Sequence, residues 1–329
     1  MKGQRQFPIV LVVNINGLFF VKRAFNVIPL KKLIPILFAL GALSCHAQGD
    51  LRRSIAMISD TQAPMRIEKL FLKSHENEKA TAKLFQQIAI LKPGYLFILG
   101  DVTSWSAKEK KWRAMDTYLQ ECRSAGITVT AVLGNHDVMG SAQKGESNFL
   151  KRFPKATPTG YYEVIDSIAF VMLNSNFKKM KPKAVELQQN WYKKTLDSLD
   201  QDSRVKMIVV SCHHAPYSNS KIVGSSKPTQ EHFVPLFISS NKCRLFITGH
   251  AHAFEHFIQS GKDFLVIGGG GGIHQPLRSD LTDLQSDYKP QFHFLTILPK
   301  HGFLQIDSYA LKDDFSGVEK RHILDLQVR

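Results

Sequence analysis

The chain alternates short apolar runs with amphipathic segments, which is the pattern of strands connected by helices. Continuous apolar runs are typical of strands buried on both faces. They lie at residues 54–59, 95–99, 128–133, 168–173, 206–211 and 244–248. Between them, apolar residues recur every three or four positions, and this spacing predicts helices at 76–91, 108–125, 185–199 and 231–239. The alternation predicts an α/β fold with parallel strand–helix–strand units.

The carboxyl-terminal part of the chain is richer in strands than in helices. Further strands are predicted at 161–164, 264–267, 292–298 and 303–310, and the turn at 299–302 makes a hairpin of the last two. Residues 138–160 show no clear periodicity and are predicted to be a loop. Because no linker or repeat divides residues 48–329, we expect one domain built from two packed mixed sheets.

Residues 1–47 are predicted to be a targeting segment rather than part of the fold. Lys31 and Lys32 precede an apolar run at 33–43, which is too short to span a bilayer comfortably as a helix, and small residues follow it. We expect cleavage after Ala47 and export of the protein, either to the periplasm or outside the cell. Two alternatives stay open: Cys45 as a lipid acceptor, or an uncleaved membrane anchor that includes the apolar residues 7–21.

The formal charge of +15 falls when the predicted targeting segment is left out. Residues 1–47 carry six Lys or Arg and no acidic residue, so the remaining domain has a formal charge of +9. This charge suits an anionic substrate or surface, but its basic residues are scattered, so nucleic acid is not indicated as a partner. Only three cysteines follow residue 47, and an odd, sparse set is not a disulfide framework.

Five of the apolar runs end in side chains that can bind metal ions. In chain order they are followed by Asp60 and Gln62, by Asp101, by Asn135, His136 and Asp137, by His213, and by His250 and His252. Because the carboxyl ends of parallel strands meet at one edge of a sheet, we expect a single polar site there. Two carboxylates, an amide and several imidazoles form a mixed nitrogen and oxygen ligand set suited to a pair of divalent cations.

The order of these motifs resembles the calcineurin-like metallophosphoesterase superfamily. The segments Gly134-Asn135-His136-Asp137 and Gly249-His250-Ala251-His252 are its specific signatures, and Gly100-Asp101 is a weaker one. Residues 161–163, 170–175 and 189–191 are also similar to its purple-acid-phosphatase-like branch. The resemblance covers about residues 54–310. It implies a four-layer α/β/β/α sandwich of two mixed sheets flanked by helices.

The resemblance also implies a site for two divalent ions (Mn, Fe, Zn or Mg), bridged by Asp101. The remaining ligands would be Asp60, Gln62 and His252 for the first ion, and Asn135, His213 and His250 for the second. His136 would donate a hydrogen bond or a proton near the leaving oxygen, and Asp137 would orient His136.

Two positions depart from the family pattern. Gln62 stands where a histidine is usual, and an amide oxygen is a weaker and harder ligand. The first site would therefore prefer Mn, Mg or Fe, bind weakly or stay empty. Ser104 stands where the purple branch has a tyrosine ligand, so no purple colour is expected.

The glycines at 268–272 lack the Lys-Ser/Thr of a P-loop, and we expect them to allow close backbone approach beneath the metal site.

The function that this resemblance implies is hydrolysis of a phosphomonoester or phosphodiester by hydroxide activated at the metal pair. The substrate would be a phosphorylated small molecule or another phosphoester. A nuclease or a cyclic-nucleotide phosphodiesterase could use the same site, but each calls for a capping element or basic groove that the sequence does not show. A third alternative is a non-catalytic binding protein whose first metal site is impaired by Gln62. The sequence does not predict the oligomeric state.

Overall fold

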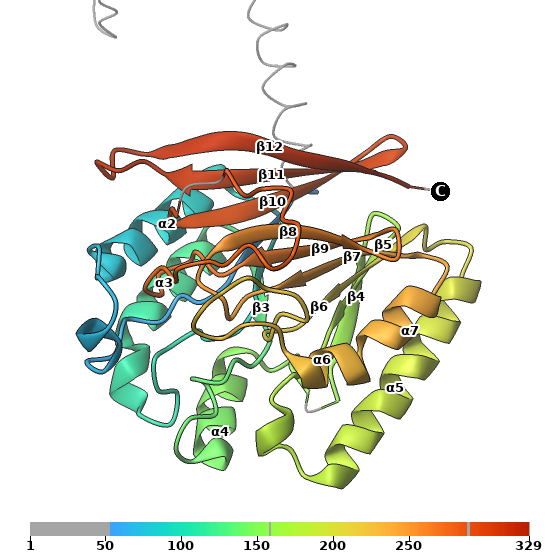
Figure 1. Ribbon diagram of the computed structural model, residues 1–329, viewed down its shortest axis with the longest axis horizontal. Coiled ribbons are helices and arrows are strands. Elements are labelled where there is room, and N and C mark those ends of the chain that lie inside the picture. Colours follow the sequence, from blue (N-terminus) through green and yellow to red (C-terminus); the bar gives the residue numbers. More distant parts are fainter. Residues whose placement is uncertain (1–52, 158, 288–289, 329) are drawn as a thin grey trace, which may run out of the picture. The chain divides into compact units, whose positions relative to one another are not determined.

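The computed structural model describes residues 53–157, 159–287 and 290–328. Two six-stranded mixed sheets pack face to face, and helices cover the outer face of each (Figure 1). This confirms the predicted four-layer α/β/β/α sandwich. The predicted targeting segment, residues 1–47, lies outside the described residues, so cleavage and export stay predictions.

The first sheet has the strand order β12-β11-β10-β1-β2-β3. Its parallel half consists of β1 (Ile55–Ile58), β2 (Tyr95–Ile98) and β3 (Thr128–Ala131). Its antiparallel half consists of β10 (His293–Lys300), β11 (Phe303–Leu311) and β12 (Val318–Gln327). Three helices cover its outer face: α2 (Asn77–Leu91), α3 (Arg113–Ser124) and α4 (Ala142–Arg152).

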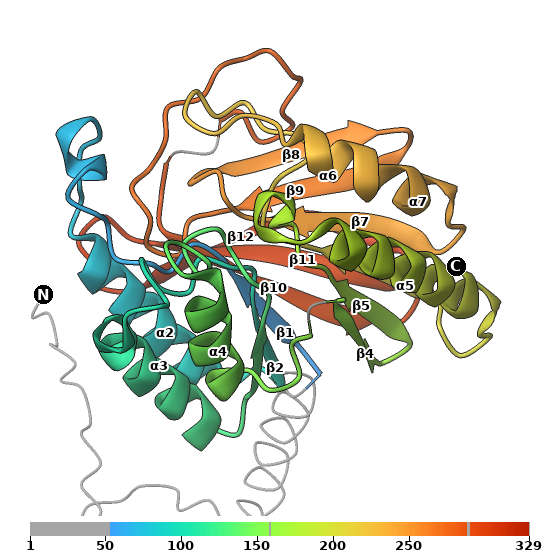
Figure 2. The same cartoon turned by 90° about the horizontal axis from the view of Figure 1, so that it is seen from below.

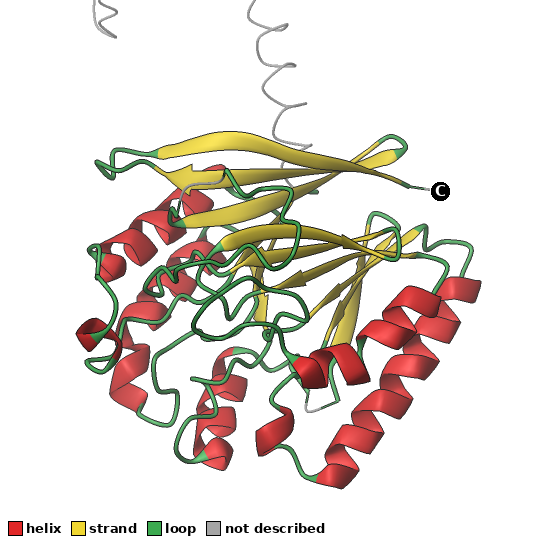
Figure 3. Ribbon diagram, viewed as in Figure 1, coloured by secondary structure: helices red, strands yellow, loops and turns green. Residues whose placement is uncertain are grey.

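The second sheet has the order β4-β5-β6-β7-β9-β8. Its four parallel strands are β5 (Ile168–Met172), β6 (Met207–Ser211), β7 (Cys243–Thr248) and β9 (Lys262–Ile267). The antiparallel edge strands are β4 (Tyr161–Ile165) and β8 (Phe254–Gln259). Helices α5 (Pro182–Gln201) and α7 (Val234–Ser239) cover its outer face, and α6 (Lys227–His232) precedes α7. Figure 3 shows the helices outside the two sheets.

The central strands are buried on both faces, which explains their continuous apolar sequences. In β1, Ile55 and Met57 face the opposite sheet, whereas Ala56 and Ile58 pack beneath the helices. Successive side chains of a strand point to opposite faces, so each strand supplies both layers of the core. The three described cysteines are buried and free, as expected. None of the described helices is long and apolar enough to cross a membrane.

The structure corrects the sequence prediction in four segments. Helix α4 occupies part of the predicted loop 138–160, β8 and β12 were not predicted, and the predicted helix 231–239 is α6 and α7 joined at Phe233. Helix α4 has little apolar periodicity because it is anchored mainly by Phe149, whose ring lies 6.5 Å from that of Trp112. Strand β12 is an edge strand rich in exposed charged residues, a composition that hides the strand signal.

Candidate active site

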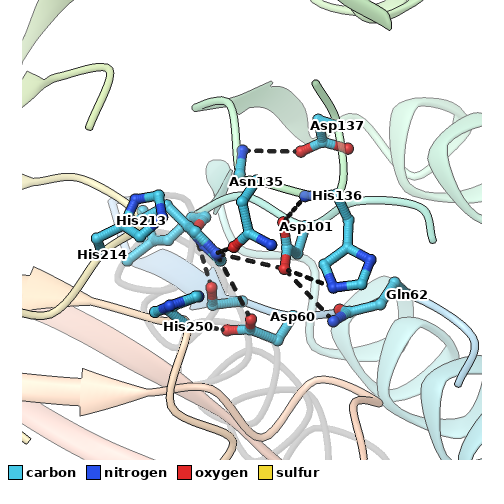
Figure 4. A network of polar contacts seen from close by, with 12 residues as sticks. Asp60, Gln62, Asp101, Asn135, His136, Asp137, His213, His214 and His250 are labelled. Atoms are coloured by element: carbon cyan, nitrogen blue, oxygen red, sulfur yellow. Dashed lines mark hydrogen bonds and ion pairs between the residues drawn. The ribbon is translucent and has the colours of Figure 1, made fainter. Parts of the chain in front are cut away.

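The predicted ligands lie at one edge of the molecule because each follows the carboxyl end of a parallel strand. Asp60, Asp101 and Asn135 come after β1, β2 and β3 of the first sheet, whereas His213 and His250 come after β6 and β7 of the second. Figure 4 shows these side chains pointing toward one another. The convergence expected from the sequence therefore occurs, and it joins the two sheets at one site.

Asp101 lies at the centre of the cluster. Its Oδ2 atom is 3.3 Å from His213 Nε2 and 3.5 Å from Gln62 Nε2. The second carboxylate, Asp60, places Oδ1 at 3.4 Å from His252 Nε2 and 4.0 Å from His213 Nε2. Both carboxyl groups are buried, and Asp60 Oδ1 has no hydrogen-bond partner in the described structure.

The imidazoles are held in the orientation of metal ligands. His213 Nδ1 donates to the Leu99 carbonyl oxygen at 2.9 Å, and His252 Nδ1 donates to the Ile273 carbonyl oxygen at 2.8 Å. Both Nε2 atoms therefore face the carboxylates, and once their protons are lost they can bind a metal ion, as histidines fixed through Nδ1 do. His250 completes a group with Asp101 and His213 in which one ligand atom from each lies within 4.8 Å of the others.

Each of the two amides of the site contacts a different histidine. Asn135 Oδ1 is 3.1 Å from His213 Nε2, and Gln62 Nε2 is 3.3 Å from His252 Nε2. Gln62 Oε1 is buried without a hydrogen-bond partner. Because a half-turn of the amide exchanges its oxygen and nitrogen, Gln62 could present its oxygen to a cation bound beside Asp101. The unpaired oxygens of Asp60 and Gln62, together with the oriented imidazoles, fit a site for cations.

The electrostatics of the cluster favour bound positive charge. Burial opposes ionisation of Asp60 and Asp101, but attraction to protonated His213 and its neighbours outweighs burial and lowers the pKa of both carboxyl groups. Burial also opposes the charged form of His213, but Asp101 and Asp60 raise its pKa to about 9. Burial lowers the pKa of His250, which stays neutral. Metal binding displaces protons from such ligands, so a cation could replace the positive charge on His213.

Three of the predicted ligands have left-handed backbone conformations. The φ angles are 60° at Asp60, 50° at Asp101 and 68° at His250. Such conformations cost on the order of 1–3 kcal/mol each in residues other than glycine and cluster at functional sites. Hydrogen bonds within the site offset part of this strain, because Asp60 Oδ2 accepts from the His250 N–H at 2.8 Å and Asp101 Oδ1 accepts from the His136 N–H at 2.8 Å.

The family model for calcineurin-like phosphoesterases matches residues 53–254, more than half of the chain. The chain belongs to the calcineurin-like phosphoesterase family. The matched segment begins just before β1, ends at the first residue of β8 and contains every predicted ligand of the site. No curated protein matches the chain by sequence.

Several solved structures have a similar fold. A purple acid phosphatase from yellow lupin (Lupinus luteus) matches with a TM-score of 0.59 and 14% identity over 81% of this chain and 52% of its own. GAP50 of Plasmodium, described as the anchor in the inner membrane complex, matches with a TM-score of 0.61 and 16% identity, over 84% of this chain and 89% of its own. A dimetal phosphatase from Danio rerio matches with a TM-score of 0.54 and 15% identity, over 84% of this chain and 99% of its own. The chain thus spans about half the length of the lupin protein.

The role predicted for Asp137 in this phosphoesterase needs correction. Its carboxylate accepts hydrogen bonds from the backbone N–H groups of Gly134 (2.9 Å), Val102 (3.3 Å) and Thr103 (3.4 Å) and from the Ser106 hydroxyl (2.8 Å). The ring of His136 instead contacts the Ser104 carbonyl oxygen through Nδ1, at 3.4 Å. Asp137 therefore fixes the loops that carry Asp101 and Asn135, and Ser104 orients His136.

His214 also lies in the site, although the motifs of the sequence did not point to it. Its ring centre lies 4.4 Å from that of His250 and 5.0 Å from that of His213. Its Nδ1 atom lies 2.8 Å from Ser175 Oγ, which also accepts from the His214 N–H at 3.0 Å. Burial lowers the pKa of His214 to about 3, so the ring is neutral. The doubled histidine after β6 was the available signal, but only its first member was assigned.

Glycines let the backbone of the phosphoesterase site pack at van der Waals contact. A methyl group on Gly249 would overlap the Ser59 hydroxyl and the Asp60 carboxylate, and one on Gly272 would overlap the His252 ring. This confirms the expectation that glycines at 268–272 allow close approach beneath the site.

Gly249→Ala is expected to lower metal affinity and turnover by roughly 10–100-fold, because it displaces the Asp60 carboxylate. Metal content after dialysis and the rate of phosphoester hydrolysis measure the effect. Gly317→Ala is the matched control, since nothing lies within 4 Å of that added methyl group. Equal metal content in both variants would contradict the assignment of Asp60 as a ligand.

Proposed function

We propose that this calcineurin-like phosphoesterase hydrolyses phosphomonoesters or phosphodiesters with two divalent metal ions. The observation that carries the proposal is the central position of Asp101. Its Oδ2 atom lies within 3.5 Å of a side chain from each predicted ligand set, Gln62 of the first and His213 of the second. Two cations held side by side by these buried ligands would repel each other. A carboxylate that binds both of them offsets this repulsion.

Under this proposal the two ligand sets share Asp101. Asp60, Gln62 and His252 would hold the first ion, and Asn135, His213 and His250 the second. When bound, divalent ions acidify water and neutralise the charge of phosphoryl oxygens. The chain itself fixes the ligands beforehand through the Leu99 and Ile273 carbonyl groups, so binding requires little reorganisation.

His136 is proposed to serve the leaving group. Its backbone N–H is fixed to Asp101, and its Nε2 atom lies 3.8 Å from Asp101 Oδ2, beside the predicted metal site. The contact of Nδ1 with Ser104 directs Nε2 toward that side. A proton on Nε2 can then pass to the oxygen of the departing alcohol as its bond to phosphorus breaks.

Metal removal and reloading test the proposal. Purified full-length protein is expected to lose hydrolysis of chromogenic mono- or diesters after chelation and to regain it with Mn²⁺ or another divalent ion, at close to two ions per chain. Elemental analysis and initial rates measure the two quantities. One ion or none, without turnover under any metal, would favour the non-catalytic binding protein.

A further inference from the structure

The segment between β1 and α2 exposes large apolar side chains. Ile67 is 55% exposed, Leu70 is 73% exposed and Phe71 is 80% exposed. They lie on or beside the single-turn helix η1 (Glu68–Leu70), which has no buried residue. Figure 2 shows this blue turn projecting from the domain above α2. Water solvates these three side chains in the isolated domain, so a surface that buries them would gain hydrophobic free energy.

This segment stands at the rim of the proposed active site. Gln62, at its start, contacts Asp101 and His252 within the site. At its end, Asn77 Nδ2 donates to the Gly271 and Gly272 carbonyl oxygens at 2.8 and 3.1 Å. Both ends of the segment are therefore fixed beside the metal cluster.

The charge of the segment indicates which surface it fits. Arg66, Lys69 and Lys73 alternate with the apolar residues, and none of them takes part in an ion pair of the described residues. The one acidic side chain, Glu68, accepts the Met65 N–H at 2.5 Å. Residues 64–73 thus carry a net charge of +2 together with their exposed apolar groups. Apolar residues flanked by free basic residues suit the interface of an anionic lipid bilayer.

Two neighbouring loops extend the same rim. Ile222, 54% exposed, and Leu284, 48% exposed, lie on the loops that follow β6 and β9. Backbone hydrogen bonds join these loops, from Lys221 to Pro276 at 2.9 Å and from Arg278 to Asn219 at 2.7 Å. Figure 2 shows both loops on the same side of the domain as η1.

We propose that residues 64–73 insert into an anionic lipid surface and hold the active site over phosphoesters carried in that surface. The lipid substrate rests on the proposed function, whereas the docking does not. Basic residues near such a surface strengthen binding by about fivefold each, so replacing Arg66, Lys69 and Lys73 with glutamine is expected to weaken binding roughly a hundredfold.

A fluorophore placed in the segment tests the docking independently of turnover. In full-length protein with Cys45→Ser, the remaining cysteines are buried, so Leu70→Cys can be labelled selectively with an environment-sensitive dye. We expect its emission to shift to the blue with phosphatidylglycerol vesicles and not with phosphatidylcholine vesicles. The matched control is Ile90→Cys, 65% exposed on α2, which should show no shift. Comparing the emission of the dye at positions 70 and 90 distinguishes this contact from any contact made by residues 1–47.

Each other outcome would overturn the docking proposal. No shift at position 70, equal shifts at positions 70 and 90, or equal shifts with both lipids would each contradict insertion of this segment into an anionic surface. A shift that grows with protein concentration without vesicles would assign the segment to a contact between copies of the chain.

A second variant tests the lipid substrate. Phe71→Glu should leave hydrolysis of a soluble ester unchanged and lower hydrolysis of phosphatidic acid or phosphatidylglycerol in vesicles at least tenfold, because the site is no longer held at the interface. If the wild type cleaves soluble esters but no lipid phosphoester, the proposal of a lipid substrate is wrong. A dye shift without cleavage of any ester would leave the docking intact and reject the proposed function.

Discussion

Asp101→Asn is expected to reduce phosphoester hydrolysis by about a thousandfold, the upper end of what the loss of one electrostatically stabilising group costs an enzyme. The asparagine keeps the size of the side chain but removes the negative charge that faces His213, His136 and Gln62. The amide is uncharged and offers a single oxygen to a metal, so it cannot bridge two cations as a carboxylate does, and the variant should also lose at least one ion. Initial rates at saturating Mn²⁺ and elemental analysis measure the two losses.

Asp307→Asn provides the control for removing a buried carboxylate. Asp307 is also buried, but it lies on β11 and pairs with Lys320 at 2.8 Å and His322 at 3.1 Å, outside the predicted ligand set. This variant should keep its metal ions and its rate per folded molecule. Wild-type turnover in Asp101→Asn, or equal losses in the two variants, would reject the bridging role.

His136→Ala is expected to lower the rate by roughly 10²–10⁴-fold while both ions remain bound. His136 lies beside the cluster, with Nε2 at 3.8 Å from Asp101, but it belongs to neither ligand set. The loss should fall on kcat, and it should be smaller for substrates whose leaving group needs no proton, such as nitrophenolate. Comparing alkyl and nitrophenyl esters, together with metal analysis, measures this difference.

Two other histidine variants serve as controls for His136→Ala. His250→Ala should lose an ion, because His250 lies in one group with Asp101 and His213. His301→Ala, on the exposed turn between β10 and β11, should change neither rate nor metal content. Metal loss in His136→Ala equal to that of His250→Ala would contradict the division into ligands and proton donor.

The sequence predicted much of the fold because the central strands are buried on both faces. Such strands have continuous apolar sequences, and the polar residues that end them stand out, as Asp60 does after β1 and His213 after β6. The parallel strand–helix pattern then places those ends at one edge. The pattern of apolar residues did not predict β12, which is only partly buried. It also did not predict α4, whose packing depends on a few aromatic side chains.

The sequence by itself determined the parallel α/β order, the motifs that end each strand, and the kinds of ligand atom that these motifs supply. Those properties are local, because they depend on which residues follow one another along the chain. Only the tertiary structure decided that Asp137 braces the backbone of two loops, that His214 packs against His250, and that Leu70 and Phe71 stand exposed at the rim. Hydrogen-bond partners and exposure depend on segments far apart in sequence, and these meet only when the two sheets pack together.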